Sequence, residues 1–139
     1  MKINIIYHTK FGNNEKIADF LADQFNFDVS VYSTKKHHPK NITEGSLYIV
    51  CSPTHIANAP FKIRRFVKRL KTQGDAKYAL IITYAAPNYK TAKTLTAILS
   101  KKAKKIGELK IKTMGMKGPL EDGWKEKIKR FAKDLILIK

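Results

Sequence analysis

Two periodicities meet within the first twenty-five residues of the chain. Residues 2–7 form a nearly continuous apolar run, which is typical of a buried strand. A polar loop with one glycine, Gly12, follows this run. Beyond the loop, apolar residues recur at the spacing of one helix face: Ile17, Phe20, Leu21 and Phe25. Because loop N–H groups and the positive end of the helix dipole converge in such a unit, this segment is suited to holding a phosphate.

The loop matches neither of two common phosphate-binding sequences. It reads His8-Thr9-Lys10-Phe11-Gly12-Asn13-Asn14. No Gly-Lys-Ser/Thr closes it, as a Walker A loop requires, and Gly12 stands alone where a dinucleotide-binding loop has three glycines. The structural alternative is a tight turn between strand and helix, with asparagine side chains as helix caps.

Strand-like and helix-like segments alternate along the rest of the chain, and no linker divides it. We therefore expect one domain over residues 1–139. Further strands are expected at residues 27–32, 47–51, 79–84 and 109–113. Further helices are expected at residues 60–71, 91–106 and 122–137, with Gly107 as the stop of the second. The stretch 33–45 has room for only one or two helical turns. This alternation favours an α/β protein with a parallel sheet and helices on both faces.

A second polar segment follows the strand expected at residues 47–51. It reads Ser52-Pro53-Thr54-His55-Ile56-Ala57-Asn58-Ala59-Pro60. The segment resembles Ser-Pro-Thr-Tyr-x-Gly-x-x-Pro of the flavodoxin family, with His55 at the aromatic position and Ala57 at the glycine. The first loop is similar to the family's Ser/Thr-x-x-Thr-Gly-x-Thr, with departures from the hydroxyl residues at His8, Phe11 and Asn14.

This resemblance implies a three-layer, doubly wound flavodoxin-like fold whose five parallel strands lie in the order 2-1-3-4-5. It also implies an FMN site in the loops after the first, third and fourth strands, at the carboxyl ends of the strands. The implied FMN-binding residues are His8, Thr9, Lys10, Phe11, Gly12, Asn13, Asn14, Pro53, Thr54, His55, Ile56, Ala57, Asn58, Ala85, Ala86 and Tyr89. Tyr89 is expected to stack on the flavin ring; the alternative is that it covers the start of the next helix.

Charge is the second informative feature. The chain has 28 Lys and Arg against 11 Asp and Glu, a formal net charge of +17. Between residues 60 and 112 stand fifteen basic residues and two acidic ones, Asp75 and Glu108. Such a surface favours acidic redox proteins, of the ferredoxin or reductase type, as partners. Salt-sensitive, non-specific contact with nucleic acid or an anionic membrane surface is the weaker alternative. A lysine-rich host proteome would explain the charge without any function.

The sequence assigns no catalytic or metal-binding residues. The four histidines and the single cysteine, Cys51, show no zinc spacing, and the expected site loops hold no paired carboxylates. No apolar run approaches the roughly 20 residues that span a bilayer, and no signal peptide is visible, so we expect a cytoplasmic protein.

These observations lead first to an FMN-binding electron-transfer protein with a basic surface, in which the cofactor supplies the redox chemistry. Two alternatives stay open. One is an FMN-dependent oxidoreductase of the quinone or porphyrinogen type. The other is a cofactor-free basic binding module on the same fold.

Overall fold

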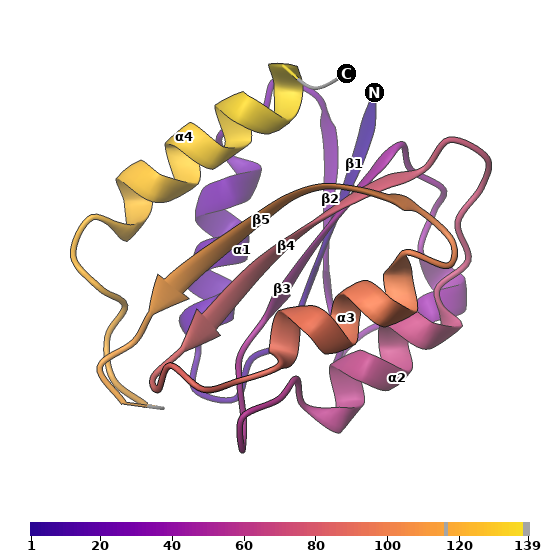
Figure 1. Cartoon of the computed structure of the whole chain (residues 1–139). Helices are drawn as coiled ribbons and strands as arrows, with labels where there is room; N and C mark the ends of the chain where they lie inside the picture. Colours follow the sequence, from indigo (N-terminus) through magenta and orange to yellow (C-terminus); the bar gives the residue numbers. More distant parts are fainter. Residues whose placement is uncertain (116, 138–139) are drawn as a thin grey trace.

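The strands form one five-stranded parallel sheet in the order β2-β1-β3-β4-β5. The computed structural model describes residues 1–115 and 117–137, and Figure 1 shows the sheet running through the middle of the molecule. The strands are β1 (Lys2–Tyr7), β2 (Asp28–Ser33), β3 (Leu47–Ser52), β4 (Lys77–Tyr84) and β5 (Lys104–Lys112). The predicted strand order is confirmed.

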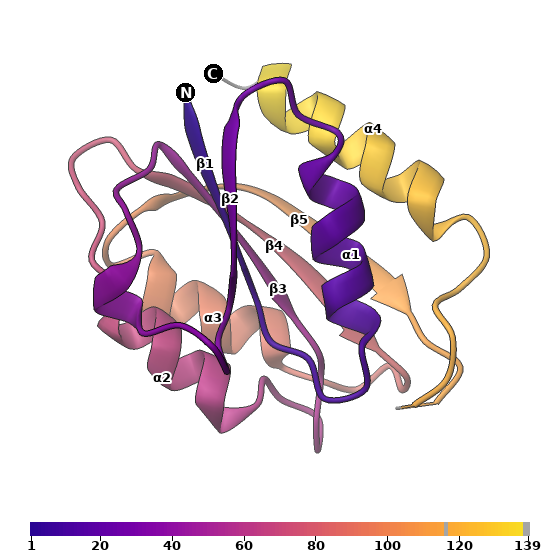
Figure 2. The ribbon, with the colours of Figure 1, turned by 180° about the vertical axis from the view of Figure 1, so that it is seen from behind.

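Within the described residues, four α-helices cover the sheet, two on each face. They are α1 (Asn13–Ala22), α2 (Phe61–Arg69), α3 (Thr91–Leu99) and α4 (Trp124–Leu137), and a single 3-10 turn, η1 (Pro39–Asn41), lies between β2 and β3. Figures 1 and 2 show α1 and α4 on one face of the sheet and α2 and α3 on the other. The fold class predicted from the alternation of segments is therefore confirmed.

The central strands are buried on both sides. Along β3, Ile49 faces the core beneath α1 and α4, and its neighbour Val50 faces the core beneath α2 and α3. All six residues of β3 are buried, as expected for a central parallel strand covered on both faces. Each fully buried Ile or Val side chain contributes about 1.5–3 kcal/mol of transfer free energy, so the middle of the sheet is a rigid support for the loops at its ends.

The strand order places the first and second polar segments side by side. β1 pairs with β2 on one side and β3 on the other, so the chain turns in opposite directions after these two strands. Tyr7 and Cys51 are partners at the carboxyl ends of β1 and β3, and Ser52 is paired with Ile82 of β4. Ligands of open α/β sheets bind at such a switch point.

The helix expected at residues 91–106 is wrong beyond Leu99, since β5 already begins at Lys104. Gly107 lies within β5, beneath α4, rather than at the end of a helix. A Cβ atom at Gly107 would stand 3.0 Å from Leu135 Cδ2 and 3.1 Å from Phe131 Cε1. The glycine thus lets α4 approach the sheet closely. The prediction failed because both a helix stop and close packing select glycine.

Lys102 joins the two helices of the α2–α3 face. Its Nζ donates hydrogen bonds to three carbonyl oxygens at the end of α2: Val67 (3.0 Å), Lys68 (2.9 Å) and Leu70 (2.6 Å). The Val67 carbonyl also accepts a 3.3 Å bond from the Leu70 N–H, and a cation at the C-terminal end of a helix complements the helix dipole. The ends of α2 and α3 are therefore held together by one side chain.

Candidate functional site

The loop after β1 presents an uncapped helix N-terminus. Gly12 occupies the N-cap position in the left-handed conformation (φ +94°), and no side chain of the described residues caps the helix. Its N–H donates to Thr9 Oγ1 at 2.8 Å, and the first intrahelical bond runs from the Lys16 N–H to the Gly12 carbonyl. The N–H groups of residues 13–15 precede that bond, so they point out of the helix at its positive end. An anion held there would satisfy them.

The two asparagines of this loop make tertiary contacts instead of capping the helix. Asn13 Nδ2 donates to the Gly118 carbonyl at 2.9 Å, and Asn14 Nδ2 lies 3.0 Å from Thr83 Oγ1. The capping alternative therefore does not describe these side chains. Instead they connect the first loop to the loop after β5 and to the end of β4.

Asn14 carries an unpartnered polar atom in a buried position. The residue has no exposed surface, and its Oδ1 has no hydrogen-bond partner among the described residues. The Thr83 hydroxyl can donate as well as accept. A flip of the side-chain amide exchanges the positions of Oδ1 and Nδ2. Oδ1 then accepts the hydrogen bond from Thr83, and Nδ2 takes the position that Oδ1 now occupies. In that orientation Asn14 can donate to an anion, as a threonine hydroxyl would.

The loop after β3 forms a two-residue hairpin. The backbone groups of His55 and Asn58 exchange hydrogen bonds of 2.7 and 3.2 Å across it. Ile56 (φ 51°) and Ala57 (φ 62°) occupy its tip in the left-handed region, as a type I′ turn requires. Ala57 thus holds a backbone conformation that glycine adopts most readily. The tip is strained, because a β-branched residue at positive φ is rare.

The hairpin is fixed to the neighbouring elements by two contacts. Thr54 Oγ1 lies 2.7 Å from Thr91 Oγ1 at the start of α3. The Ala57 carbonyl accepts a 2.8 Å bond from the N–H of Lys90. The second and third loops of the predicted site are therefore one connected unit.

Tyr89, in the loop after β4, stacks on Tyr84 at the end of that strand. The ring centroids lie 5.0 Å apart with an interplanar angle of 23°, and Lys110 Nζ stands 5.7 Å from the Tyr89 centroid. Tyr89 also packs against the core beneath α2 and α3. It therefore supports Tyr84, and its stacking on a flavin stays a prediction.

A hollow of about 30 Å³ lies where the three loops meet, and the residues after β5 close one side of it. The residues lining it are Thr9, Lys10, Phe11, Asn13, Asn14, Pro53, Thr54, His55, Thr83, Tyr84, Ala85 and Thr113. Its volume suits one end of a ligand, and the remainder of the ligand would lie along the rim.

The structure gathers nine of the sixteen predicted residues around this hollow. The others, which do not line it, are His8, Gly12, Ile56, Ala57, Asn58, Ala86 and Tyr89. The sequence prediction missed three lining residues: Thr83 and Tyr84, which end β4, and Thr113, which follows β5. Their positions in the sequence could have identified them, because polar residues at the carboxyl ends of neighbouring parallel strands share one edge of the sheet.

Lysine, not histidine, carries the positive charge of the site. Burial and the nearby basic side chains of Lys35, His55 and Lys62 lower the pKa of His8 to about 4, with burial as the largest cause. Burial also lowers the pKa of His55, with Lys10 and Lys35 as further causes. Both imidazoles are therefore neutral near pH 7. His8 Nδ1 lies 2.7 Å from Thr34 Oγ1, so it contributes to packing beneath the loop.

Phe11 holds two ammonium groups beside the loop. Lys10 Nζ and Lys117 Nζ stand 5.4 and 5.5 Å from its ring centroid. Cations are attracted to the face of an aromatic ring. Phe11 thus concentrates positive charge at the site.

Other kinds of site find no support in the described residues. Within residues 1–115 and 117–137, no group of three or more His, Cys, Asp or Glu side chains could hold a metal ion. Burial raises the pKa of the Cys51 thiol, so it stays protonated. None of the described helices has the length and apolar character needed to cross a bilayer.

No protein-family model and no curated protein sequence matches the chain. Solved structures match it along its full length. Flavodoxin 2 from Bacillus cereus has a TM-score of 0.82 and 21% identity, with 100% of both chains covered. The fold is flavodoxin-like. The flavodoxin of Streptococcus pneumoniae TIGR4 has a TM-score of 0.76 and 20% identity, with 100% of both chains covered. Rubredoxin oxygen:oxidoreductase from Desulfovibrio gigas has a TM-score of 0.75 and 20% identity, and the match covers 99% of this chain and 35% of that one.

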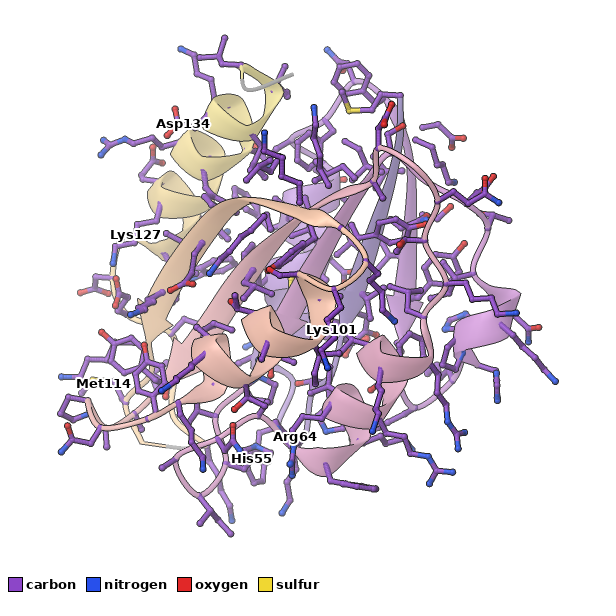
Figure 3. All side chains as sticks on the ribbon, turned by 45° about the vertical axis from the view of Figure 1, so that its right-hand side comes forward. His55, Arg64, Lys101, Met114, Lys127 and Asp134 are labelled. Atoms are coloured by element: carbon purple, nitrogen blue, oxygen red, sulfur yellow. The ribbon has the colours of Figure 1, made fainter. Side chains whose placement is uncertain are left out.

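In this flavodoxin-like fold the hollow lies at the loops after β1, β3 and β4, with His55 toward the lower edge of Figure 3. At such identities the similarity concerns the fold and not the ligand. The chemistry of the site therefore has to be argued from its own residues.

Proposed function

We propose that this protein binds FMN at the hollow and carries electrons between larger redox proteins. The observation that carries the proposal is the uncapped N-terminus of α1, at the point where the strand order reverses, beside the buried Asn14 amide, whose Oδ1 has no partner among the described residues. A phosphate monoester would satisfy both features at once.

The residues present fit an FMN phosphate. The N–H groups of residues 13–15 and the Thr9 hydroxyl supply donors, Asn14 supplies another after its amide flip, and Lys10 supplies charge. Hydrogen bonds to charged groups contribute about 1.5–3 kcal/mol each. The site needs no hydroxyl at Phe11 for this purpose.

The flavin ring would lie along the rim formed by residues 53–57 and 84–86. Tyr84 and the hairpin backbone are the groups that would pack against it. When bound, the flavin supplies reversible one- and two-electron redox chemistry, and the protein supplies position and electrostatics. The neutral His8 and His55 leave the lysines as the nearby cations.

Electron carriage predicts fast exchange with a protein partner and little turnover of small substrates. We expect the FMN-loaded protein to accept electrons from a reduced, acidic two-iron ferredoxin in a stopped-flow experiment, with a rate that falls as salt rises. With NADPH and menadione, its steady-state turnover should equal that of free FMN at the same concentration. Quinone turnover well above free FMN would contradict carriage and favour an oxidoreductase.

A further inference from the structure

The two helical faces of the protein differ in charge. α2 and α3 carry six basic residues and no acidic ones, whereas α1 and α4 carry six basic and four acidic residues. Figure 3 shows the basic residues Arg64 and Lys101 on the α2–α3 side. On the side of α4 it shows one basic residue, Lys127, and one acidic residue, Asp134. A uniform lysine bias does not produce this asymmetry.

Arginine is concentrated even more strongly. The chain has four arginines, and three of them, Arg64, Arg65 and Arg69, lie on α2. The guanidinium group binds carboxylates through two parallel hydrogen bonds, which a lysine cannot do. In a chain whose cations are otherwise almost all lysine, arginine on one helix indicates that this helix binds planar anions.

These arginines line a groove between α2 and α3 with a volume of about 850 Å³. The residues lining the groove are Phe61, Arg64, Arg65, Lys68, Arg69, Thr94, Ile98, Lys101 and Lys102. None is acidic, and no cation of α2 takes part in an ion pair within the described part of the chain. Arg64 Nε is buried without a hydrogen-bond partner there. Apart from Lys102, whose ammonium group binds three carbonyls, the positive charge of the groove is thus not compensated by acidic groups of the described residues.

Two exposed apolar residues flank the start of α2. The Phe61 side chain is 65% exposed, and Ile56, at the tip of the hairpin, is 96% exposed. Phe61 also lies against the guanidinium of Arg64, at 5.7 Å. Aromatic, aliphatic and arginine side chains together are typical of the centre of a protein interface. A second copy of this chain would bring like charges together, so the occupant is an acidic protein.

We propose that Ile56, Phe61, Arg64, Arg65 and Arg69, together the α2 docking surface, bind the carboxylate-rich face of an acidic redox partner. The inference rests on the proposed function for the partner's class, because the hairpin joins this surface to the rim where the flavin would lie. Apolar contact at Ile56 and Phe61 would bring the partner's redox centre to the flavin edge, while the arginines fix its orientation.

Two charge-matched double variants test this surface. Arg65→Glu with Arg69→Glu alters exposed residues of α2, and Arg130→Glu with Lys133→Glu alters exposed residues of α4; both lower the net charge by four. The probe is a labelled acidic two-iron ferredoxin, titrated with flavin-free protein and followed by fluorescence anisotropy in 50 mM salt. We expect binding at least about tenfold weaker for the α2 variant and less than threefold weaker for the α4 variant. Equal losses in both variants, or no loss in either, would overturn the proposal.

A charge-conserving variant tests the role of arginine itself. Arg65→Lys with Arg69→Lys keeps the net charge and the helix propensity, and we expect it to bind ferredoxin about three- to tenfold more weakly, because only the bidentate geometry is lost. The oligonucleotide dT20 serves as the competing polyanion. Tighter binding of dT20 than of ferredoxin, lost in the same α2 variant, would overturn the proposal in favour of a nucleic-acid surface.

The readout separates this inference from the function on which it rests. Since the binding assay uses flavin-free protein, a failure to bind FMN would remove electron carriage and leave the ferredoxin result intact. Conversely, the protein could bind FMN tightly while its ferredoxin binding does not depend on Arg65 and Arg69. That result would leave the flavin site intact and remove the docking surface.

Discussion

Replacing Asn14 with leucine and Thr83 with valine will weaken FMN binding about a hundredfold and leave the flavin-free protein at least as stable. The loss corresponds to about 2.7 kcal/mol, one charge-assisted hydrogen bond together with the desolvation of the phosphate next to an apolar group. Isothermal calorimetry with FMN and urea unfolding of the flavin-free protein measure the two effects separately.

The expected stability has an independent physical reason. In the flavin-free protein Asn14 Oδ1 is buried without a partner among the described residues, and Asn14 Nδ2 bonds to Thr83 Oγ1. Replacing both members of a buried polar pair with apolar groups of similar shape is nearly neutral or stabilising. In a ligand-binding pair, the two substitutions lower the affinity for FMN and keep or raise the free energy of unfolding. In a purely structural pair, they do not have these opposite effects.

Asn4→Leu is the matched control. Asn4 is also fully buried, and its Oδ1 has no partner among the residues that the structure describes, but it lies near the start of β1, where its Nδ2 bonds to the Thr43 carbonyl. Its replacement should leave FMN affinity unchanged. If the Asn14→Leu, Thr83→Val variant binds FMN as tightly as the wild type, or unfolds more than 2 kcal/mol more easily, the pair is structural and the phosphate does not contact it.

Acidification from pH 7.5 to 4.5 will cost the folded state about 2.5 kcal/mol at His8 alone. Burial, with Lys35 and other cations, lowers the pKa of His8 from 6.5 to about 4 in the folded protein. Between these two values the unfolded chain binds a proton at this position and the folded chain does not. The stabilising contribution is therefore complete above pH 6.5 and is lost as the pH falls toward 4.

The variant His8→Asn removes the titrating group and keeps a polar atom near Thr34 Oγ1. Urea unfolding at pH 7.5 and 4.5 should show a smaller loss of stability for this variant than for the wild type, by about 2.5 kcal/mol. His38→Asn, at an exposed histidine, should lose stability as the wild type does. Parallel losses in all three proteins would show that acid destabilises the chain through other groups.

The architecture was readable from the sequence because its signals are local. The apolar runs at β1 and β3 mark buried central strands, and the polar segments that follow them mark the loops at their carboxyl ends. The switch-point rule then places those loops together without any knowledge of tertiary contacts. That is why Thr9, Asn14 and His55 could be assigned to one site.

What the sequence did not show depends on contacts between distant segments. Asn14 bonds to Thr83, 69 positions further along the chain, and Asn13 to Gly118, 105 positions further. No local pattern encodes these partners. Tyr89 was identified as an aromatic residue of the third loop, but its stacking on Tyr84 depends on how that loop folds back over β4.

The charge required the fold before it could be interpreted. In the sequence, the fifteen basic residues of positions 60–112 form one continuous enrichment. The fold places five of them on α2, one on α3, one on β4, four on β5 and four in loops, and the three arginines among them all lie on α2. The proposal of an anion-binding surface on α2 therefore depends on the fold as well as on the sequence.

The most direct test of the central claim is a titration of the flavin-free protein with FMN and with riboflavin, followed by quenching of flavin fluorescence. The two ligands differ only in the phosphate group, so the ratio of their dissociation constants measures the contribution of the phosphate site at the N-terminus of α1. We predict an FMN dissociation constant well below about 100 µM, the value equivalent to roughly 5.5 kcal/mol, and riboflavin binding at least tenfold weaker. No quenching, or equal affinities for the two ligands, would contradict a phosphate-anchored flavin site.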